Sequence, residues 1–142
     1  KKLLKNELSK NPLSKKKIIN KLSNFEKIKL IKGNTISTLH KFVKSKKEID
    51  FAFIDGGHSL NTIKKDWKNI NKLMSENSLV IFDDYYEFIS KKKINAGCNK
   101  VINSLPKKKY TSFKYPIGDI FFDKYNKINK KIFMVSVKKH DL

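Results

Sequence analysis

Two short hydrophobic segments, each followed at once by acidic residues, constrain the fold of this chain more than any other feature. Residues 51–54 read Phe-Ala-Phe-Ile and precede Asp55, while residues 79–82 read Leu-Val-Ile-Phe and precede Asp83 and Asp84. Short segments that are apolar at every position are typical of strands buried on both faces of a parallel sheet. We therefore expect two buried strands that carry three carboxylates at their carboxyl ends.

The residues between these two segments have the spacing of an amphipathic helix. Ser59 is the expected N-cap and Asn77 the expected end of this helix. A strand, a helix and a strand with short connections form a right-handed βαβ unit, in which the two strands are parallel. Asp55 then lies beside Asp83 and Asp84, at the sheet edge where open α/β sheets bind their ligands. The apolar residues that recur on one helix face, at intervals of three and four, are Leu60, Ile63, Trp67, Ile70 and Leu73.

Helix and strand patterns alternate along the rest of the chain, after a poorly defined segment at residues 1–13. Such alternation predicts an α/β fold with a mostly parallel sheet. Two closing strands without a helix between them predict an antiparallel hairpin at the C-terminal end. No second domain is indicated, so residues 1–142 are expected to form one domain. The expected elements are helices at 15–23, 35–43 and 97–105, strands at 28–31, 109–115 and 132–137, a loop at 87–94, an extended piece at 118–122 and a polar turn at 124–131.

Composition places the chain among globular proteins of a reducing compartment. Its 142 residues are enough for one hydrophobic core, and no apolar run approaches the roughly 20 residues that cross a membrane. Cys98 is the only cysteine, which excludes a disulfide framework. We therefore expect a cytoplasmic protein that has no membrane partner, and the sequence leaves a homodimer open.

The net charge of +20 raises the question of a nucleic-acid partner. All 33 basic residues are lysines, whereas arginine is the residue that reads guanine and grips phosphate with a planar fork. The lysines are also spread over the whole length of the chain. We therefore interpret the charge as a solvated surface and do not expect a nucleic-acid partner. A non-catalytic basic module that binds nucleic acid is kept as an alternative.

The carboxylates predicted at one sheet edge are candidate ligands of a cation. Asp55, Asp83 and Asp84 would repel one another unless a positive charge lay among them, and ligand sets made only of oxygen favour Mg²⁺. Such an ion could bind two adjacent hydroxyls of a substrate and lower the pKa of one of them. The alternative is that Asp83 or Asp84 only caps a turn.

His58 follows the first strand end after two glycines, which allow a sharp bend and the close approach of a ligand. An imidazole at this edge could remove a proton from a hydroxyl near neutral pH, although a structural hydrogen bond in the loop would also explain His58. Tyr85 and Tyr86 follow the acids directly and could pack on a substrate ring. The turn at Gly33 and Asn34 could contact a ligand at the same edge, although an ordinary turn would explain it too.

These motifs resemble class I S-adenosylmethionine-dependent methyltransferases, and among them the branch that holds the macrocin-type O-methyltransferases. The resemblance rests on Phe-Ile-Asp-Gly-Gly-His-Ser at residues 53–59 and Val-Ile-Phe-Asp-Asp-Tyr at residues 80–85, with Lys65 and Asp66 on the helix between them. Residues 31–35 and 96–101 are similar to the turn after the third strand of that fold and to the helix after its fifth strand.

The resemblance implies an enzyme with a Rossmann-like sheet. It would transfer a methyl group from S-adenosylmethionine to a hydroxyl of a small molecule or a sugar, with assistance from Mg²⁺. A sugar-tailoring or hydroxylase-like relative on the same fold is kept as an alternative. The residues that the resemblance assigns are Gly33, Asn34, Thr35, Asp55 and Gly56 to the cofactor, Asp55, Asp83 and Asp84 to the metal, and His58 and Asp55 to catalysis.

The chain departs from the family pattern in two respects. Gly57 stands where the macrocin-type branch often has a second aspartate. In addition, the Gly-rich loop that cradles the methionine moiety, and the acid-ended strand that follows it, are not found before Ser14. We therefore expect the C-terminal two-thirds of a methyltransferase sheet, with the first strands missing.

Overall fold

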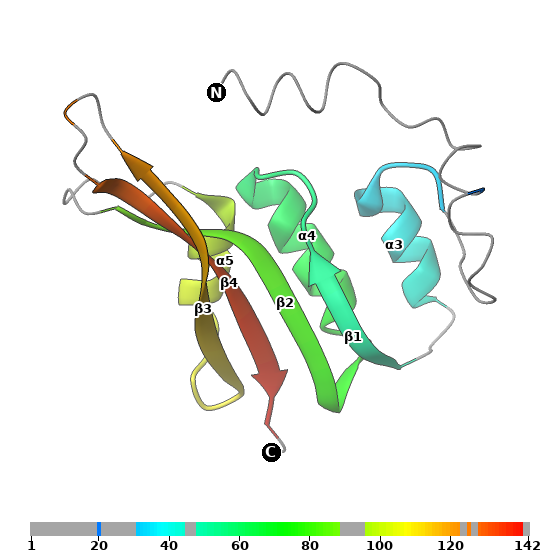
Figure 1. The fold of residues 1–142 in the computed structure, drawn as a ribbon. Helices are drawn as coiled ribbons and strands as arrows, with labels where there is room; N and C mark the ends of the chain where they lie inside the picture. Colours follow the sequence, from blue (N-terminus) through cyan, green and yellow to red (C-terminus); the bar gives the residue numbers. More distant parts are fainter. Residues whose placement is uncertain are drawn as a thin grey trace. The chain divides into compact units, whose positions relative to one another are not determined.

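A computed structural model describes residues 20, 31–44, 48–88, 96–122, 125 and 128–140 of the chain. Contacts group the chain into Lys1–Lys32 and Gly33–Leu142, and the helices and strands from α3 to β4 belong to the second unit. The predicted helix at 15–23, apart from Asn20, and the predicted strand at 28–31, apart from Ile31, lie outside the described residues. In chain order the elements are α3 (Thr35–Val43), β1 (Ile49–Ile54), α4 (Leu60–Ile70), β2 (Met74–Phe88), α5 (Gly97–Asn103), β3 (Tyr110–Phe122) and β4 (Ile128–Lys139), as Figure 1 shows.

The described strands form one sheet in the order β1-β2-β4-β3. Strands β1 and β2 are parallel neighbours, with Ile54 opposite Phe82, so the predicted βαβ pairing is confirmed. Strand β4 is antiparallel to both β2 and β3. The predicted α/β fold with an antiparallel hairpin at the C-terminal end is therefore confirmed.

Helix α4 begins where the sequence predicts, because the Ser59 hydroxyl accepts the Thr62 N–H at 3.1 Å. It ends at Ile70, so the prediction that Asn77 ends the helix is wrong. Asn77 lies in β2, inside an irregularity where β2 advances from Met74 to Leu79 while β1 advances only two residues. Ser78 stabilises this bulge, since its buried hydroxyl donates to the Ile49 carbonyl at 2.5 Å.

Strand β2 and the two strands after it are longer than their apolar patterns predicted. Strand β2 continues to Phe88, into the segment expected to be a loop at 87–94. Strand β3 runs through Pro116 without ending, with an irregularity in its pairing between Pro116 and Ile120. Strand β4 begins at Ile128, so the polar turn predicted at 124–131 is wrong in its second half. Pairing between β3 and β4 extends both strands beyond their hydrophobic residues, which sequence periodicity does not report.

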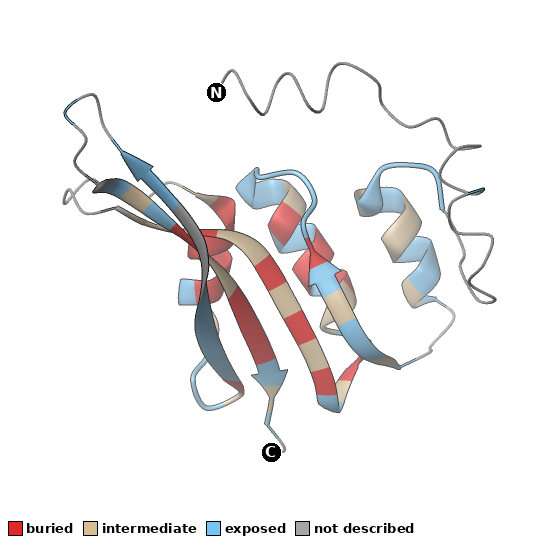
Figure 2. Cartoon of the chain, in the orientation of Figure 1, coloured by how far each residue is buried: buried red, intermediate tan, exposed pale blue. Residues whose placement is uncertain are grey.

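Helices α4 and α5 pack on one face of the sheet and form the core with it. The Trp67 ring of α4 lies between two strand rings, with centroid distances of 5.5 Å to Phe82 and 5.4 Å to Tyr110. Cys98 and Val101 of α5 are buried in the same cluster. Figure 2 shows buried residues along β2 and β4 and on the helix sides that meet them. None of the helices in the described part of the chain is long and apolar enough to cross a membrane.

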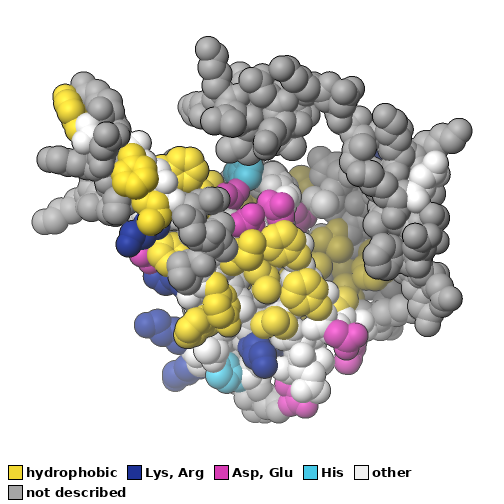
Figure 3. Space-filling view, viewed as in Figure 1, with side chains coloured by type: hydrophobic (Ala, Val, Ile, Leu, Met, Phe, Trp, Pro, Cys, Tyr) yellow, Lys and Arg dark blue, Asp and Glu magenta, His cyan; other side chains and the backbone are white. Residues whose placement is uncertain are grey.

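The opposite face of the sheet exposes large hydrophobic side chains. Phe51 and Phe53 are 55% and 48% exposed, so the prediction that this strand is buried on both faces is wrong for the described part of the chain. Phe113 and Tyr115 of β3 are also exposed, and their ring centroids are 4.8 Å apart. Figure 3 shows hydrophobic side chains gathered over this face of the sheet. Successive side chains of β1 point to opposite faces of the sheet, and the strand is apolar on both. Among the described elements, helices cover only one of these faces, so the sequence overestimated the burial of β1.

Candidate functional site at the carboxyl ends of β1 and β2

The parallel pairing of β1 and β2 brings two acidic segments to one edge of the sheet. Asp55 follows Ile54, and Asp83 follows Phe82, which is the residue paired with Ile54. Neighbouring strands lie about 4.8 Å apart, so the two acidic segments start side by side. Asp55 is exposed and Asp83 is partly buried.

A bulge in β2 sets the direction of the next carboxylate. Between Phe82 and Tyr85, β2 advances three residues while β4 advances only two, so β2 holds one extra residue there. Asp84 lies in this bulge with φ 60°, in the left-handed region that most side chains avoid. Its N–H donates to Asp83 Oδ1 at 2.8 Å. Bulges of this kind redirect side chains and are common next to active sites.

His58 and Asp84 form the polar contact at the centre of the site. His58 Nδ1 and Asp84 Oδ2 are 2.5 Å apart, and the Tyr86 hydroxyl donates to Asp84 Oδ1 at 2.8 Å. The His58 side chain is 71% exposed, whereas that of Asp84 is 20% exposed. A neutral imidazole that donates through Nδ1 keeps Nε2 as a proton acceptor. The pair therefore consists of an accessible imidazole and a mostly buried carboxylate that contacts its Nδ1.

This pairing differs from the sequence-based prediction in one respect. We expected His58 to act beside Asp55, the acid of its own strand, but its contact is with Asp84 of the neighbouring strand. The bulge explains this difference, because it holds Asp84 in a left-handed conformation that directs its side chain toward His58. No apolar pattern in the sequence predicts that conformation.

The predicted magnesium ligands do not gather into a cation site. Among the described residues, which include Asp55, Asp83 and Asp84, no three His, Cys, Asp or Glu side chains lie together as a metal would require. Both oxygens of Asp84 are engaged, one by His58 and one by Tyr86, and Asp83 accepts a backbone N–H. The donor set therefore does not fit Mg²⁺ in this arrangement, and the metal assignment of Asp55, Asp83 and Asp84 stays a prediction.

Burial and the neighbouring carboxylates together raise the pKa of two groups next to this site, Tyr86 and Cys98. Burial, the hydrogen bond to Asp84 and the nearby carboxylates raise the pKa of Tyr86 above its usual range, so its hydroxyl keeps the proton that it donates. Burial, with the charges of Asp84 and Asp83, raises the pKa of Cys98 to about 12. Cys98 is therefore a packed thiol at neutral pH, since nucleophilic cysteines are thiolates.

The turn predicted to contact the cofactor begins α3. Gly33 has φ +144°, and a Cβ there would lie 2.6 Å from Thr38 Cγ2, so only glycine suits this position. The Asn34 side chain accepts the Ile36 N–H at 2.9 Å and caps the helix, and Thr35 is the first helical residue. Capping accounts for Asn34 without a ligand, and the cofactor assignment of Gly33, Asn34 and Thr35 stays a prediction.

The loop after β1 is better suited to a ligand. Asp55, Gly56 and His58 are all exposed. A Cβ at Gly56 would lie 3.3 Å from Asp66 Oδ2, so the loop backbone lies close over this carboxylate of α4. Exposed backbone without a side chain, next to the exposed carboxylate of Asp55, fits the polar edge of a nucleoside such as that of S-adenosylmethionine. Asp55 and Gly56 therefore remain the best cofactor candidates of this chain.

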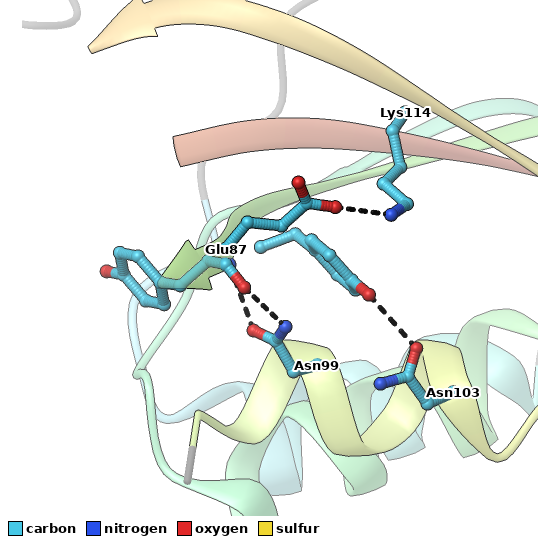
Figure 4. A network of polar contacts seen from close by, with 6 residues as sticks. Glu87, Asn99, Asn103 and Lys114 are labelled. Atoms are coloured by element: carbon cyan, nitrogen blue, oxygen red, sulfur yellow. Dashed lines mark hydrogen bonds and ion pairs between the residues drawn. The ribbon is translucent and has the colours of Figure 1, made fainter. Parts of the chain in front are cut away.

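The two tyrosines predicted to contact substrate have different environments. Tyr85 belongs to the core and its hydroxyl donates to Asn103 Oδ1 at 3.1 Å. Lys114 lies 5.1 Å above the Tyr85 ring and pairs with Glu87 at 2.5 Å, which raises the pKa of Lys114 (Figure 4). Because these contacts account for Tyr85, the less buried Tyr86 is the better candidate for substrate contact.

Two polar residues at the site were given no functional role from the sequence. Asn99 of α5 binds the backbone of Tyr86 through both ends of its amide, and nothing in the local sequence predicts this. Asp66 is buried on α4, and its Oδ1 has no hydrogen-bond partner among the described residues. Its position three residues after Ile63, on the apolar stripe itself, was the available signal.

We predict that the backbone of Asp84 is strained and that glycine relieves the strain. Asp84→Gly and Asp84→Ala both remove the carboxylate, but only glycine adopts φ 60° without a steric cost. Asp84→Gly should therefore be about 1 kcal/mol more stable than Asp84→Ala in urea unfolding. Equal stability of the two variants would show that the left-handed conformation is not kept in solution.

Comparisons with known proteins show the family and the fold of the chain. A family model described as a methyltransferase domain matches residues 6–85, more than half of the chain. An uncharacterised protein of Acanthamoeba polyphaga mimivirus is 26% identical over 69 residues, which are 49% of this chain and 31% of that protein. The matched region thus spans about a third of the length of this curated relative.

Two solved structures share the fold. An rRNA methylase from Streptococcus thermophilus superposes with a TM-score of 0.60 and 18% identity, over 91% of this chain and 70% of that chain. A chain from Streptococcus mutans, titled "a putative methyltransferase" in complex with SAH (S-adenosylhomocysteine), gives a TM-score of 0.55 and 16% identity, over 90% of this chain and 73% of that chain. Because the family model covers more than half of the chain, the chain belongs to the methyltransferase domain family, and these two structures share its fold.

Proposed function

We propose that this chain carries the catalytic side of an O-methyltransferase that uses S-adenosylmethionine and methylates a hydroxyl of a small molecule or a sugar. The observation that supports this best is the contact between His58 Nδ1 and Asp84 Oδ2 at 2.5 Å, at the carboxyl ends of two parallel strands. Hydroxyl oxygens are weak nucleophiles until they lose a proton, and an oriented imidazole is the side chain that most often removes one.

In the proposed reaction His58 acts as the general base. Asp84 accepts the Nδ1 proton, which leaves Nε2 free to take the proton of the acceptor hydroxyl. The positive charge that develops on the ring is then stabilised by the Asp84 carboxylate, and the Tyr86 hydroxyl holds this carboxylate from its other oxygen. Asp55 and Gly56 would hold the cofactor. When bound, S-adenosylmethionine supplies the methyl group on its sulfonium.

The metal-assisted form of this reaction, which the resemblance implied, is not part of the proposal. Asp84 already binds His58 and Tyr86, and the described carboxylates do not gather around a common point. Proton removal is therefore assigned to His58 instead of to a metal-bound hydroxyl.

A second candidate acceptor is RNA. It is favoured by the net charge of +20, and the structural neighbour from Streptococcus thermophilus is titled an rRNA methylase. The absence of arginine from the sequence and the exposed base at His58 favour the small hydroxyl acceptor. Binding that weakens steeply with salt would be the mark of an RNA substrate.

The test is a transfer assay with the full-length protein and S-adenosylmethionine that carries a labelled methyl group. Three acceptor sets are compared: hydroxylated aromatic compounds, sugars and total rRNA. We expect label in a hydroxyl acceptor, at an unchanged rate in excess chelator. Label only in rRNA would support the second candidate, and oxygen consumption without methyl transfer would support a hydroxylase-like relative. A rate abolished by the chelator would contradict the assignment of the base.

A further inference from the structure

We infer that Asn99 of α5 is a positioning residue that holds the end of β2 so that Asp84 faces His58. This inference rests on the proposed function of the His58–Asp84 pair. Asn99 acts through the backbone of Tyr86, and its role requires no contact with His58 or with a substrate.

The first step is the way β2 ends. Strand β1 stops at Ile54, opposite Phe82, but β2 continues to Phe88. Beyond Phe82, the described part of the sheet gives β2 a strand neighbour on one side only, where Tyr86 pairs with Ile132 of β4. On its other side, none of the described strands binds the N–H and carbonyl groups of this part of β2.

Asn99 takes the place of that strand. Its Oδ1 accepts the Tyr86 N–H at 3.0 Å, and its Nδ2 donates to the Tyr86 carbonyl at 2.8 Å. Asn99 is 3% exposed, so these bonds lie out of water, where breaking them is costly. Figure 4 shows the amide facing the β2 backbone from the helix below it. One side chain therefore fixes both polar groups of this residue, as a neighbouring strand would.

The second step links this clamp to the carboxylate. Tyr86 is two residues from Asp84, and its hydroxyl donates to Asp84 Oδ1 at 2.8 Å. Asp84 itself has the unfavourable φ of 60°, which persists only when the surroundings hold it. A fixed Tyr86 therefore fixes both the backbone after the bulge and one carboxylate oxygen, which leaves Oδ2 directed at His58.

The same helix also contacts the other member of the pair. A Cβ at Gly97 would lie 2.8 Å from the His58 carbonyl oxygen and 2.8 Å from the Leu60 nitrogen, so the start of α5 lies directly against this backbone. Gly97 and Asn99 are two residues apart and contact the chain at His58 and at Tyr86, respectively. Helix α5 is thus a common support for the base and its carboxylate.

The alternative is that Asn99 only satisfies two backbone groups and has no influence on His58. The two roles differ in the tautomer of the His58 ring. A neutral imidazole without a partner prefers the proton on Nε2, whereas the contact with Asp84 requires it on Nδ1. The ¹⁵N chemical shifts of the ring nitrogens report this tautomer, without substrate and without methyl transfer.

The experiment measures these shifts at about pH 9, where imidazoles are neutral, in four variants that form two matched pairs. Asn99→Ala is compared with Asn103→Ala, which removes the same side chain one helical turn later, where it binds Tyr85. Tyr86→Phe is compared with Tyr85→Phe, which removes the neighbouring hydroxyl that does not reach Asp84.

We expect the Nδ1–H form of His58 to dominate in the wild type and in both controls. In Asn99→Ala and Tyr86→Phe the ratio of the two tautomers should fall about 3- to 10-fold, as the weakening of the hydrogen bond between Tyr86 and Asp84 implies. In the full-length protein kcat should fall by a similar factor at unchanged KM for S-adenosylmethionine, and this loss should disappear in an Asp84→Asn background.

The results separate this inference from the proposed function. An unchanged tautomer in both test variants overturns the positioning role, whatever the activity. If the tautomer responds but the wild type transfers no methyl group, the positioning role stands and the proposed function fails. If Asn99→Ala does not fold, Tyr86→Phe decides, since it keeps both bonds of Asn99 to the backbone.

Discussion

His58→Ala in the full-length protein is expected to lower kcat for methyl transfer by about 10²- to 10⁴-fold, the usual contribution of a general base. The affinity for S-adenosylmethionine should not change, because the variant removes a group that acts on the acceptor proton. Asp84→Asn should lower kcat nearly as much, since an amide in place of the carboxylate turns the ring to the wrong tautomer. Isothermal titration with S-adenosylmethionine and steady-state kinetics measure the two effects separately.

The other two histidines provide controls for this prediction. His140 lies at the end of β4, where its Nε2 binds the Thr111 hydroxyl, and His40 lies on α3. His40→Ala and His140→Ala should keep wild-type kcat. The double variant of His58 and Asp84 should be no slower than His58→Ala alone, because the carboxylate acts only through the ring. Additive losses, or a His58→Ala enzyme with more than about a tenth of wild-type kcat, would contradict the role of His58 as base.

The parts of this fold that the sequence predicted are those governed by local periodicity. The stripe that contains Ile63 and Trp67 located α4, and the Ser59 hydroxyl caps it as expected. Parallel pairing of the two acid-ended strands followed from the short connections around this helix. From these rules alone the edge of the sheet that carries the candidate site could be predicted.

The arrangement inside the site follows from contacts that periodicity does not encode. The bulge that turns Asp84 toward His58 depends on pairing with β4, a strand more than forty residues later in the chain. Asn99 reaches β2 because α5 packs beside this strand, and no motif around residue 99 predicts that contact. The burial predicted for Phe51 is wrong for a different reason. An apolar strand pattern does not say whether another element covers the second face of the strand.

Phe82→Ala should destabilise the domain more than the loss of the Asp84 carboxylate or of the Asn99 amide. Phe82 is 0% exposed and lies against the Trp67 ring at a centroid distance of 5.5 Å. Removing a buried phenyl ring leaves a cavity and costs about 3–5 kcal/mol, a large part of the roughly 5–15 kcal/mol that holds a domain folded. Urea unfolding followed by tryptophan fluorescence would measure the loss, because Trp67 is the only tryptophan and reports on this contact.

Phe113 provides the matched control, since it is a phenylalanine in the same sheet that is 60% exposed. Phe113→Ala loses mainly its contact with the Tyr115 ring and should cost no more than about 1 kcal/mol. If the two variants lost equal stability, the face that carries Phe113 would have to be as buried in solution as the face that carries Phe82. Because Phe82 directly precedes the acidic bulge, its loss should also loosen Asp84, and kcat should fall before the domain unfolds.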